Sequence, residues 1–216
     1  MPQVFSRNAN LYARFSILGG VLGLTGLSLA ALVWARSPYA TQQGEPVSQP
    51  IQFSHKHHVT DDGIDCRYCH TTVETSSFAG MPSTQTCMNC HSQIWDQSAA
   101  LEPVRMSFRT GQPIEWNRVH DLADFVYFDH SIHVQKGVGC STCHGQVDEM
   151  PLTSKAESMQ MSWCLDCHRD PARYVRPREE VFNMNWRPPS NQDEIGQQLV
   201  QQYVIESLMN CSTCHR

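Results

Sequence analysis

The chain has 216 residues, of which 17% are charged, with a formal net charge of −5 at pH 7 and ten cysteines. The negative charge excludes a strongly basic surface, so no nucleic-acid partner is expected. Only about 18% of the residues beyond position 34 are Phe, Ile, Leu or Val, which is below the roughly 20% at which disorder is suspected. This part of the chain is therefore either disordered or filled by something other than side chains.

The segment 15–34, FSILGGVLGLTGLSLAALVW, carries no charge. Twenty helical residues span about 30 Å, the thickness of a hydrocarbon core, so residues 1–36 are predicted to form a cytoplasmic N-terminus and a single transmembrane anchor. Arg7 and Arg14 precede the apolar segment without any acidic residue, which places the remainder of the chain on the periplasmic side. A cleaved signal peptide is the competing interpretation, although its apolar core is normally shorter.

Residues 37–52 are rich in Pro, Gln and Ser and are predicted to form a tether. Two similar modules follow, at 53–97 and 128–168, and a connector at 98–127 separates them. Each module begins with Phe-x-His-x-x-His and continues with two Cys-x-x-Cys-His motifs. Because Cys-x-x-Cys-His motifs are typical of c-type haem attachment, we infer an internal duplication of a two-haem module. The connector is expected to be a loop with at most a short strand.

The last region, 169–216, is predicted to contain an Arg- and Pro-rich loop, a helix from about 193 to 210, and a fifth motif. With short helices around each motif and little sheet, the expected fold class is a mostly irregular, small-α multihaem chain. Its duplicated modules are similar to those of class III cytochromes, and one N-terminal transmembrane helix is added.

Cys-x-x-Cys-His is the attachment signature of c-type haem. Its two thiols bond the vinyl groups of one porphyrin, and the adjacent imidazole becomes the proximal ligand of the iron. The five motifs use every cysteine: Cys66, Cys69, Cys87, Cys90, Cys140, Cys143, Cys164, Cys167, Cys211 and Cys214. Their histidines are His70, His91, His144, His168 and His215. Because all five motifs end in His, we favour five haem c groups over zinc sites or redox dithiols. The porphyrins would then supply the missing apolar core.

A second, distal ligand is needed wherever an iron is six-coordinate. The predicted distal ligands are His55, His58, His120, His130 and His133, which leaves His57 over. The sequence does not decide which of them serves which haem. The rival ligands are Met81, Met159 and Met161, since each lies shortly before a motif and methionine raises the potential of a haem. With both axial positions filled, no iron can bind a substrate, so we expect electron transfer and no catalytic residue.

The sequence resembles the pentahaem cytochrome c subunit of alternative complex III, a bacterial quinol oxidoreductase. The resemblance covers nearly the whole chain. It rests on the N-terminal helix, FSHKHH before the first motif, AGMPSTQTCMNCH, RVHDLADFVYFDHSIH and WCLDCHRDP. It implies a place in the bacterial cytoplasmic membrane, within a respiratory or photosynthetic chain. The implied partners are an iron–sulfur subunit related to molybdopterin oxidoreductases, integral membrane subunits, and a monohaem cytochrome or another periplasmic acceptor.

Two other functions compete with a relay subunit. The chain could be a stand-alone, membrane-anchored multihaem quinol dehydrogenase that oxidises quinol at its first haem. The 16 residues between anchor and first module argue against this, because such an enzyme holds its first haem at the membrane surface. The third interpretation is a haem donor subunit of a photosynthetic reaction centre.

Overall fold

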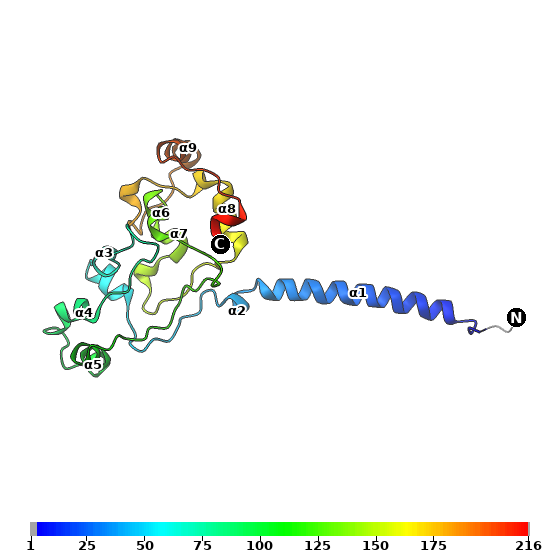
Figure 1. Cartoon of the computed structure of the whole chain (residues 1–216), viewed down its shortest axis with the longest axis horizontal. Helices are drawn as coiled ribbons and strands as arrows, with labels where there is room; N and C mark the ends of the chain where they lie inside the picture. Colours follow the sequence, from blue (N-terminus) through cyan, green and yellow to red (C-terminus); the bar gives the residue numbers. More distant parts are fainter. Residues whose placement is uncertain (1–3, 216) are drawn as a thin grey trace. The chain divides into compact units, whose positions relative to one another are not determined.

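Figure 1 shows the computed structural model of the chain, in which residues 4–215 are described. The chain divides after Gln42 into an N-terminal unit, Met1–Gln42, and a second unit, Gln43–Arg216. The first three residues of the predicted anchor region, 1–36, lie outside the described residues.

The N-terminal unit consists of α1 (Ala9–Ala35) and the short helix α2 (Pro38–Thr41). α1 has 27 residues, so it is about 40 Å long at 1.5 Å per residue, more than a hydrocarbon core requires. None of its residues is buried, and it is long and apolar enough to cross a membrane. The predicted N-terminal apolar helix is therefore confirmed; by length and composition it fits a membrane anchor or a signal sequence.

Deletion of residues 1–36 is expected to move the protein from the membrane fraction to the soluble fraction while it keeps its haem. The reason is that all five motifs lie in the second unit, whereas the long apolar helix lies in the first. Ultracentrifugation without detergent, followed by a pyridine haemochrome assay of both fractions, checks this. A truncated chain that still sediments with membranes at full haem content would show that the second unit carries its own membrane contact.

The second unit is built from short helices joined by irregular segments. Its described residues contain isolated β-bridges but no sheet. The α-helices are α3 (Cys66–Cys69), α4 (Thr84–His91), α5 (Glu102–Thr110), α6 (His130–Gln135), α7 (Cys140–His144), α8 (Met161–Arg169), α9 (Gln192–Gln202) and α10 (Cys211–Cys214). Shorter helical turns are η1 (His57–Asp61), η2 (Ala99–Leu101), η3 (Val147–Glu149), η4 (Pro171–Arg173) and η5 (Arg178–Glu180). The predicted fold class is confirmed, with a short helix at every motif (Figure 1).

The second half of the predicted tether lies along the second unit. The backbone N–H of Gly44 donates to the carbonyl of Lys155 at 2.8 Å, and that of Val47 donates to Thr153 at 3.2 Å. Ile51 is buried with Leu101 in a small apolar cluster. From Gln43 on, the segment is therefore held by backbone hydrogen bonds rather than hanging as a free linker.

The connector contains a helix that the expectation of a loop missed. α5 has Pro103 in its first turn, where the lack of an N–H costs nothing, and Glu102 at its positive N-terminal end. Gly111 closes it in the left-handed conformation, with φ of +71°. Pro103 and Gly111 are therefore the start and stop signals of a helix rather than marks of a loop.

α9 ends earlier than the predicted helix at 193–210. The chain leaves the helix at Tyr203, because Val204 adopts a left-handed backbone with φ of +51°. Lys136 holds this turn by donating its Nζ hydrogens to the carbonyls of Tyr203 and Val204. Residues 205–210 consequently form no helix, and an irregular segment leads to the fifth motif.

Side chains alone provide little core in the second unit. Ten hydrophobic side chains are buried among the described residues, and six of them form two small clusters. One cluster surrounds Val104, and the other consists of Val175, Leu199 and Tyr203. Since burial of apolar area contributes about 25 cal/mol per Å², so small a core must be supplemented by other apolar groups.

Candidate haem-binding sites

The five Cys-x-x-Cys-His motifs are presented on short helices. α3, α7 and α10 are little more than the motif itself, and α4 and α8 carry it near their C-terminal ends. Residues three apart lie on one face of a helix, so the two thiols of a motif point the same way. The N–H of His70 bonds the carbonyl of Cys66, and that of His215 bonds Cys211, both at 2.9 Å. None of the ten cysteines forms a disulfide.

Backbone carbonyls hold the Nδ1 atoms of three motif histidines. The Nδ1–O distances are 2.8 Å for His70 and Gly80, 3.0 Å for His91 and Ile94, and 3.1 Å for His215 and Phe125. Because a carbonyl only accepts, Nδ1 must carry the hydrogen. The lone pair of Nε2 is then left for a metal, which is the arrangement that orients a ligating imidazole.

The two Phe-x-His-x-x-His segments have the same geometry, with one histidine stacked on the phenylalanine and the other edge-on to it. The ring centroids are 5.0 and 4.5 Å apart from Phe53 to His55 and His58, and 4.8 and 4.5 Å apart from Phe128 to His130 and His133. In both segments the second histidine bonds the carbonyl four residues earlier through Nδ1, at 2.8 and 2.7 Å. The sequence repeat is therefore also a repeat in three dimensions.

The second histidine of each segment faces the second motif of the same module. His58 faces His91 with ring centroids 6.1 Å apart, and His133 faces His168 at 6.2 Å. An iron bonded to two imidazoles separates their ring centres by about 6 Å, since each bond is about 2 Å long and each nitrogen lies about 1 Å from its ring centre. Both pairs thus have the spacing that a shared iron requires.

The first histidine of each segment lies near the first motif of its module. His130 is nearly parallel to His144, at 10° and with centroids 6.4 Å apart. Burial, and next the proximity of His70, lower the pKa of His55 to about 4. Such a neutral imidazole is the form in which histidine binds metals. Three histidine pairs consequently have the spacing of a shared iron, at the second, third and fourth motifs, and His55 lies near His70 at the first.

The remaining two histidines are placed differently. His120 has its Nε2 atom 3.2 Å from Nδ1 of His144, and the ring centroids are only 4.3 Å apart, too close for an iron between them. His57 stacks on Trp95 at 5.8 Å and has its Nε2 atom 3.6 Å from the carboxylate of Asp62. A role of His120 as the fifth distal ligand remains a prediction, and this contact does not support it.

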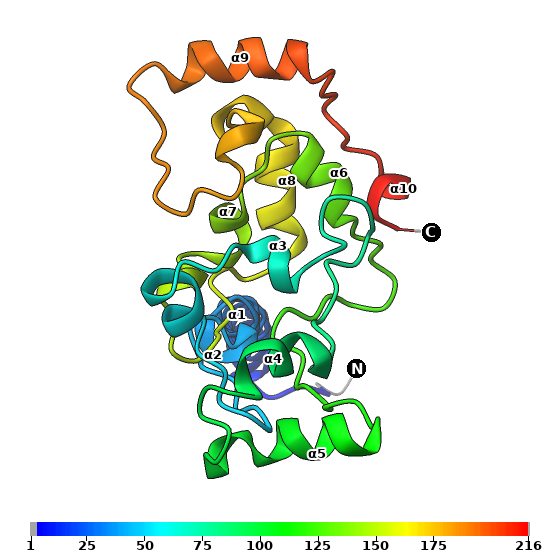
Figure 2. The ribbon, with the colours of Figure 1, turned by 90° about the vertical axis from the view of Figure 1, so that its left-hand side faces the viewer.

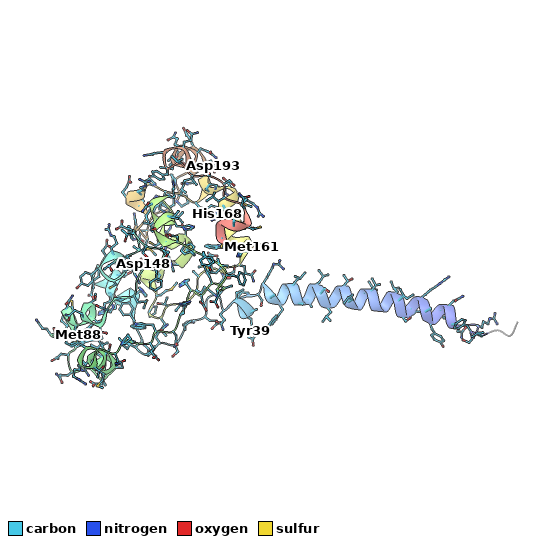
Figure 3. All side chains as sticks on the ribbon, viewed as in Figure 1. Tyr39, Met88, Asp148, Met161, His168 and Asp193 are labelled. Carbon is cyan, nitrogen blue, oxygen red and sulfur yellow. The ribbon has the colours of Figure 1, made fainter. Side chains whose placement is uncertain are left out.

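The rival methionine ligands also remain predictions. Met81 and Met161 expose 51% and 66% of their surface, whereas Met159 is half-buried with a backbone φ of +56°. Met161 begins α8, the helix that carries His168 (Figure 3). All three therefore lie close in sequence to a motif without a contact that fixes their role.

Burial of the motif thiols suits their conversion to thioethers. Burial raises the pKa of Cys143 to about 12, with the neighbouring Cys167 as the next cause. It raises the pKa of Cys140 and of Cys167 to about 11. A buried thiolate would be costly, whereas a thioether carries no charge. The donor set, its spacing and its burial therefore fit covalently bound haem.

Comparisons with known proteins agree with this chemistry. Residues 51–107 match the family described as cytochrome c7 and related cytochrome c, and residues 132–216 match the family described as cytochrome c3. A stretch of 129 residues is 36% identical to the menaquinone reductase multihaem cytochrome c subunit of Nitratidesulfovibrio vulgaris. It covers 57% of this chain and 53% of that protein, so the chain spans about half the length of this curated relative. The first match falls on the first module and the second on most of the second module and the fifth motif, so the chain has a small multihaem cytochrome c fold, and these families indicate covalently bound haem c.

Proposed function

We propose that this chain is an electron-transfer subunit of a membrane quinol–quinone oxidoreductase and carries five haem c groups. Haem c supplies one-electron exchange at its iron when bound. The observation that carries the proposal is the spacing of the histidine pairs, 6.1 to 6.4 Å in three cases. Imidazoles of the chain would occupy both axial positions at those motifs, which leaves no position for a substrate.

The residues of the chain act as holders and tuners. The cysteine pairs fix each group to a helix, and the anchored Nδ1 atoms set the orientation of each ligating ring. Axial ligand identity, hydrogen bonding and burial are the means by which a protein sets the potential of a haem. None of these roles requires a proton or a substrate to move, and we therefore propose no active site in this chain.

The order of the motifs in space differs from their order in sequence. The side-chain amide of Asn89 in the second motif donates to the Tyr68 hydroxyl in the first at 3.1 Å, so these two motifs adjoin. Tyr68 lies on α3, and both ribbon views place α3 between α4 and α7, the helices of the second and third motifs (Figures 1 and 2).

The first motif adjoins the third through shared neighbours. The guanidinium of Arg67 in the first motif lies over the ring of Phe182 at 4.5 Å. The carbonyl of Val181, the preceding residue, accepts a hydrogen bond from the N–H of Cys140 in the third motif at 3.1 Å. Moreover, Nδ1 of His130 lies 2.9 Å from the carbonyl of Ser77, in the loop that follows the first motif. The two modules therefore meet at their first motifs.

The last two steps follow the order of the sequence. His130 and His133 on the single helix α6 face the third and fourth motifs, which brings those motifs together. Ser207, four residues before the fifth motif, donates its hydroxyl to the carbonyl of His168 at 2.8 Å. The order second, first, third, fourth, fifth forms one continuous relay, and the second and fifth motifs are its ends.

The partners are proposed from the similarity of this chain to known proteins. The relative from Nitratidesulfovibrio vulgaris is a menaquinone reductase subunit, and the sequence resembles the pentahaem subunit of alternative complex III. The first similarity favours an assembly with the other subunits of a quinone reductase. The resemblance to alternative complex III adds an iron–sulfur subunit, integral membrane subunits that bind the quinone, and a periplasmic cytochrome. α1 would anchor the chain in the cytoplasmic membrane, with the haem-binding unit on the periplasmic side.

A stand-alone quinol dehydrogenase is the second candidate. From Gln43 on, the segment after the anchor is hydrogen-bonded within the second unit and cannot extend freely. This observation favours the stand-alone enzyme. Quinol oxidation by the purified chain, without partners, would support this candidate. Inactivity of the chain alone, together with activity in the assembled complex, supports the relay subunit.

The relay function is tested by counting haems and their spin states. A pyridine haemochrome assay on purified protein is expected to give five haems per chain. Low-temperature EPR is expected to show low-spin iron at four or more of them, and at most one should bind carbon monoxide. Fewer haems than motifs, or carbon monoxide at several irons, would contradict the proposal.

A further inference from the structure

His120 contacts the motif histidine His144 directly, so no space for an iron is left between the two imidazoles. The two rings lie at 73° with centroids 4.3 Å apart, and Nε2 of His120 is 3.2 Å from Nδ1 of His144. The rings of His130 and His144 are parallel to within 10°, and their centroids are 6.4 Å apart, the spacing of two imidazoles on one iron. His130 is thus placed to share an iron with His144, whereas His120 lies at Nδ1, the nitrogen of His144 that would not bind the iron.

A hydrogen bond at Nδ1, the nitrogen that does not bind the metal, orients a ligating histidine. At His70, His91 and His215 a backbone carbonyl occupies this position. At His144 it is occupied by the side chain of His120. A neutral imidazole accepts through one nitrogen and donates through the other, so Nε2 of His120 can accept the Nδ1 hydrogen of His144. The third motif is therefore held by a side chain, whereas the first, second and fifth are held by the main chain.

We propose that His120 is a positioning residue for the third haem, which accepts a hydrogen bond from His144 and does not bind iron. The contact fixes the orientation of the His144 ring and makes its Nε2 a stronger electron donor. A stronger donor stabilises ferric over ferrous iron, so His120 lowers the reduction potential of that haem. The inference rests on haem attachment at the third motif and is independent of the relay role.

The ligand count changes as a result. With His120 assigned to His144, four histidine pairs remain for five motifs. His57 stacks on Trp95, and the ring in contact with His215 in the fifth motif is that of Phe125 at 5.6 Å. The fifth iron therefore has a ligand set that differs from the other four, and it is the one expected to give a distinct EPR signal.

Three variants of the full-length, haem-loaded protein test the assignment. His120→Ala is expected to keep five haems and the low-spin count, while the potential of one haem rises. A tenfold shift of its ferric-to-ferrous ratio corresponds to about 59 mV for one electron. His120→Gln should recover much of this shift, because the amide oxygen can accept the same hydrogen bond. His130→Ala, the matched control, should instead convert one low-spin iron to a high-spin iron that binds carbon monoxide.

The outcomes separate the roles. A new high-spin iron in His120→Ala, equal to that in His130→Ala, would identify His120 as a ligand and overturn the proposal. Unchanged potentials of all five haems in His120→Ala would overturn it as well. Should His120→Ala lose haem, His120→Gln decides: five haems with an unchanged low-spin count support positioning, and a high-spin iron contradicts it.

Discussion

Without haem attachment, residues 37–216 are expected to be largely unfolded. Only ten hydrophobic side chains are buried among the described residues, and six of them form two small clusters. The ordering of each residue costs roughly 1–2 kcal/mol of conformational entropy, and so small a core cannot offset that cost. The porphyrins add large apolar faces, and their covalent attachment ties each face to the chain. Binding and folding are then one process, as in small metal-dependent domains.

Comparison of a chain without residues 1–36, made with and without the haem-attachment machinery, checks this expectation. The haem-loaded chain should unfold cooperatively on heating. The haem-free chain should lose most of its near-UV circular dichroism and show no cooperative transition. A cooperative thermal transition of the haem-free chain would contradict the prediction and show that the two side-chain clusters suffice for folding.

Local parts of the haem sites could be predicted from the sequence. A Cys-x-x-Cys-His motif occupies one helical turn, so its chemistry needs no distant contact. The Phe-x-His-x-x-His segments are equally local, and Asp129 caps α6 by accepting the N–H of Ile132, as its position suggests. The duplication in sequence therefore implied the duplication in geometry that Phe53 and Phe128 display.

Other features depend on residues far apart in the chain. The end of α9 is held by Lys136, which is distant in sequence from Val204. The edge contact of His120 with His144 and the carbonyl of Gly80 at His70 could not be read from spacing. Gly80 itself gave a partial signal, because its φ of +86° is a conformation that favours glycine. The order of the motifs is likewise a long-range property, since it depends on how the two modules meet.

Loss of the first haem is expected to disturb two other haems, whereas loss of the second is expected to disturb one. In the order second, first, third, fourth, fifth, the first motif has two neighbours and the second motif is an end. Oxidation of one iron adds a positive charge, which raises the reduction potential of a neighbouring haem. At an effective dielectric constant of 20, this electrostatic interaction is on the order of 1 kcal/mol. Removal of a haem therefore shifts the reduction potential of each adjacent haem and scarcely affects the potentials of the others.

The double substitution Cys66→Ala/Cys69→Ala removes the first attachment site, and Cys87→Ala/Cys90→Ala is the matched control at an end. Spectroscopic redox titration of each variant with four haems should show two shifted potentials in the first case and one in the second. In the first variant, electrons placed on the second haem should also equilibrate far more slowly with the other three, because the link between the modules is gone.

A single substitution, His55→Met, tests the same order of motifs with less risk of unfolding the protein. His55→Met keeps the cysteines of the first motif and, because a methionine ligand raises the potential, makes the first haem an electron trap. If the modules meet at their first motifs, this trap lies between the second haem and the third, so transfer between the two modules should slow. If transfer between the modules is unaffected while the first haem stays reduced, the modules are joined elsewhere. The chain would then conduct through a different pair of motifs than the contacts of Arg67, Phe182 and Cys140 indicate.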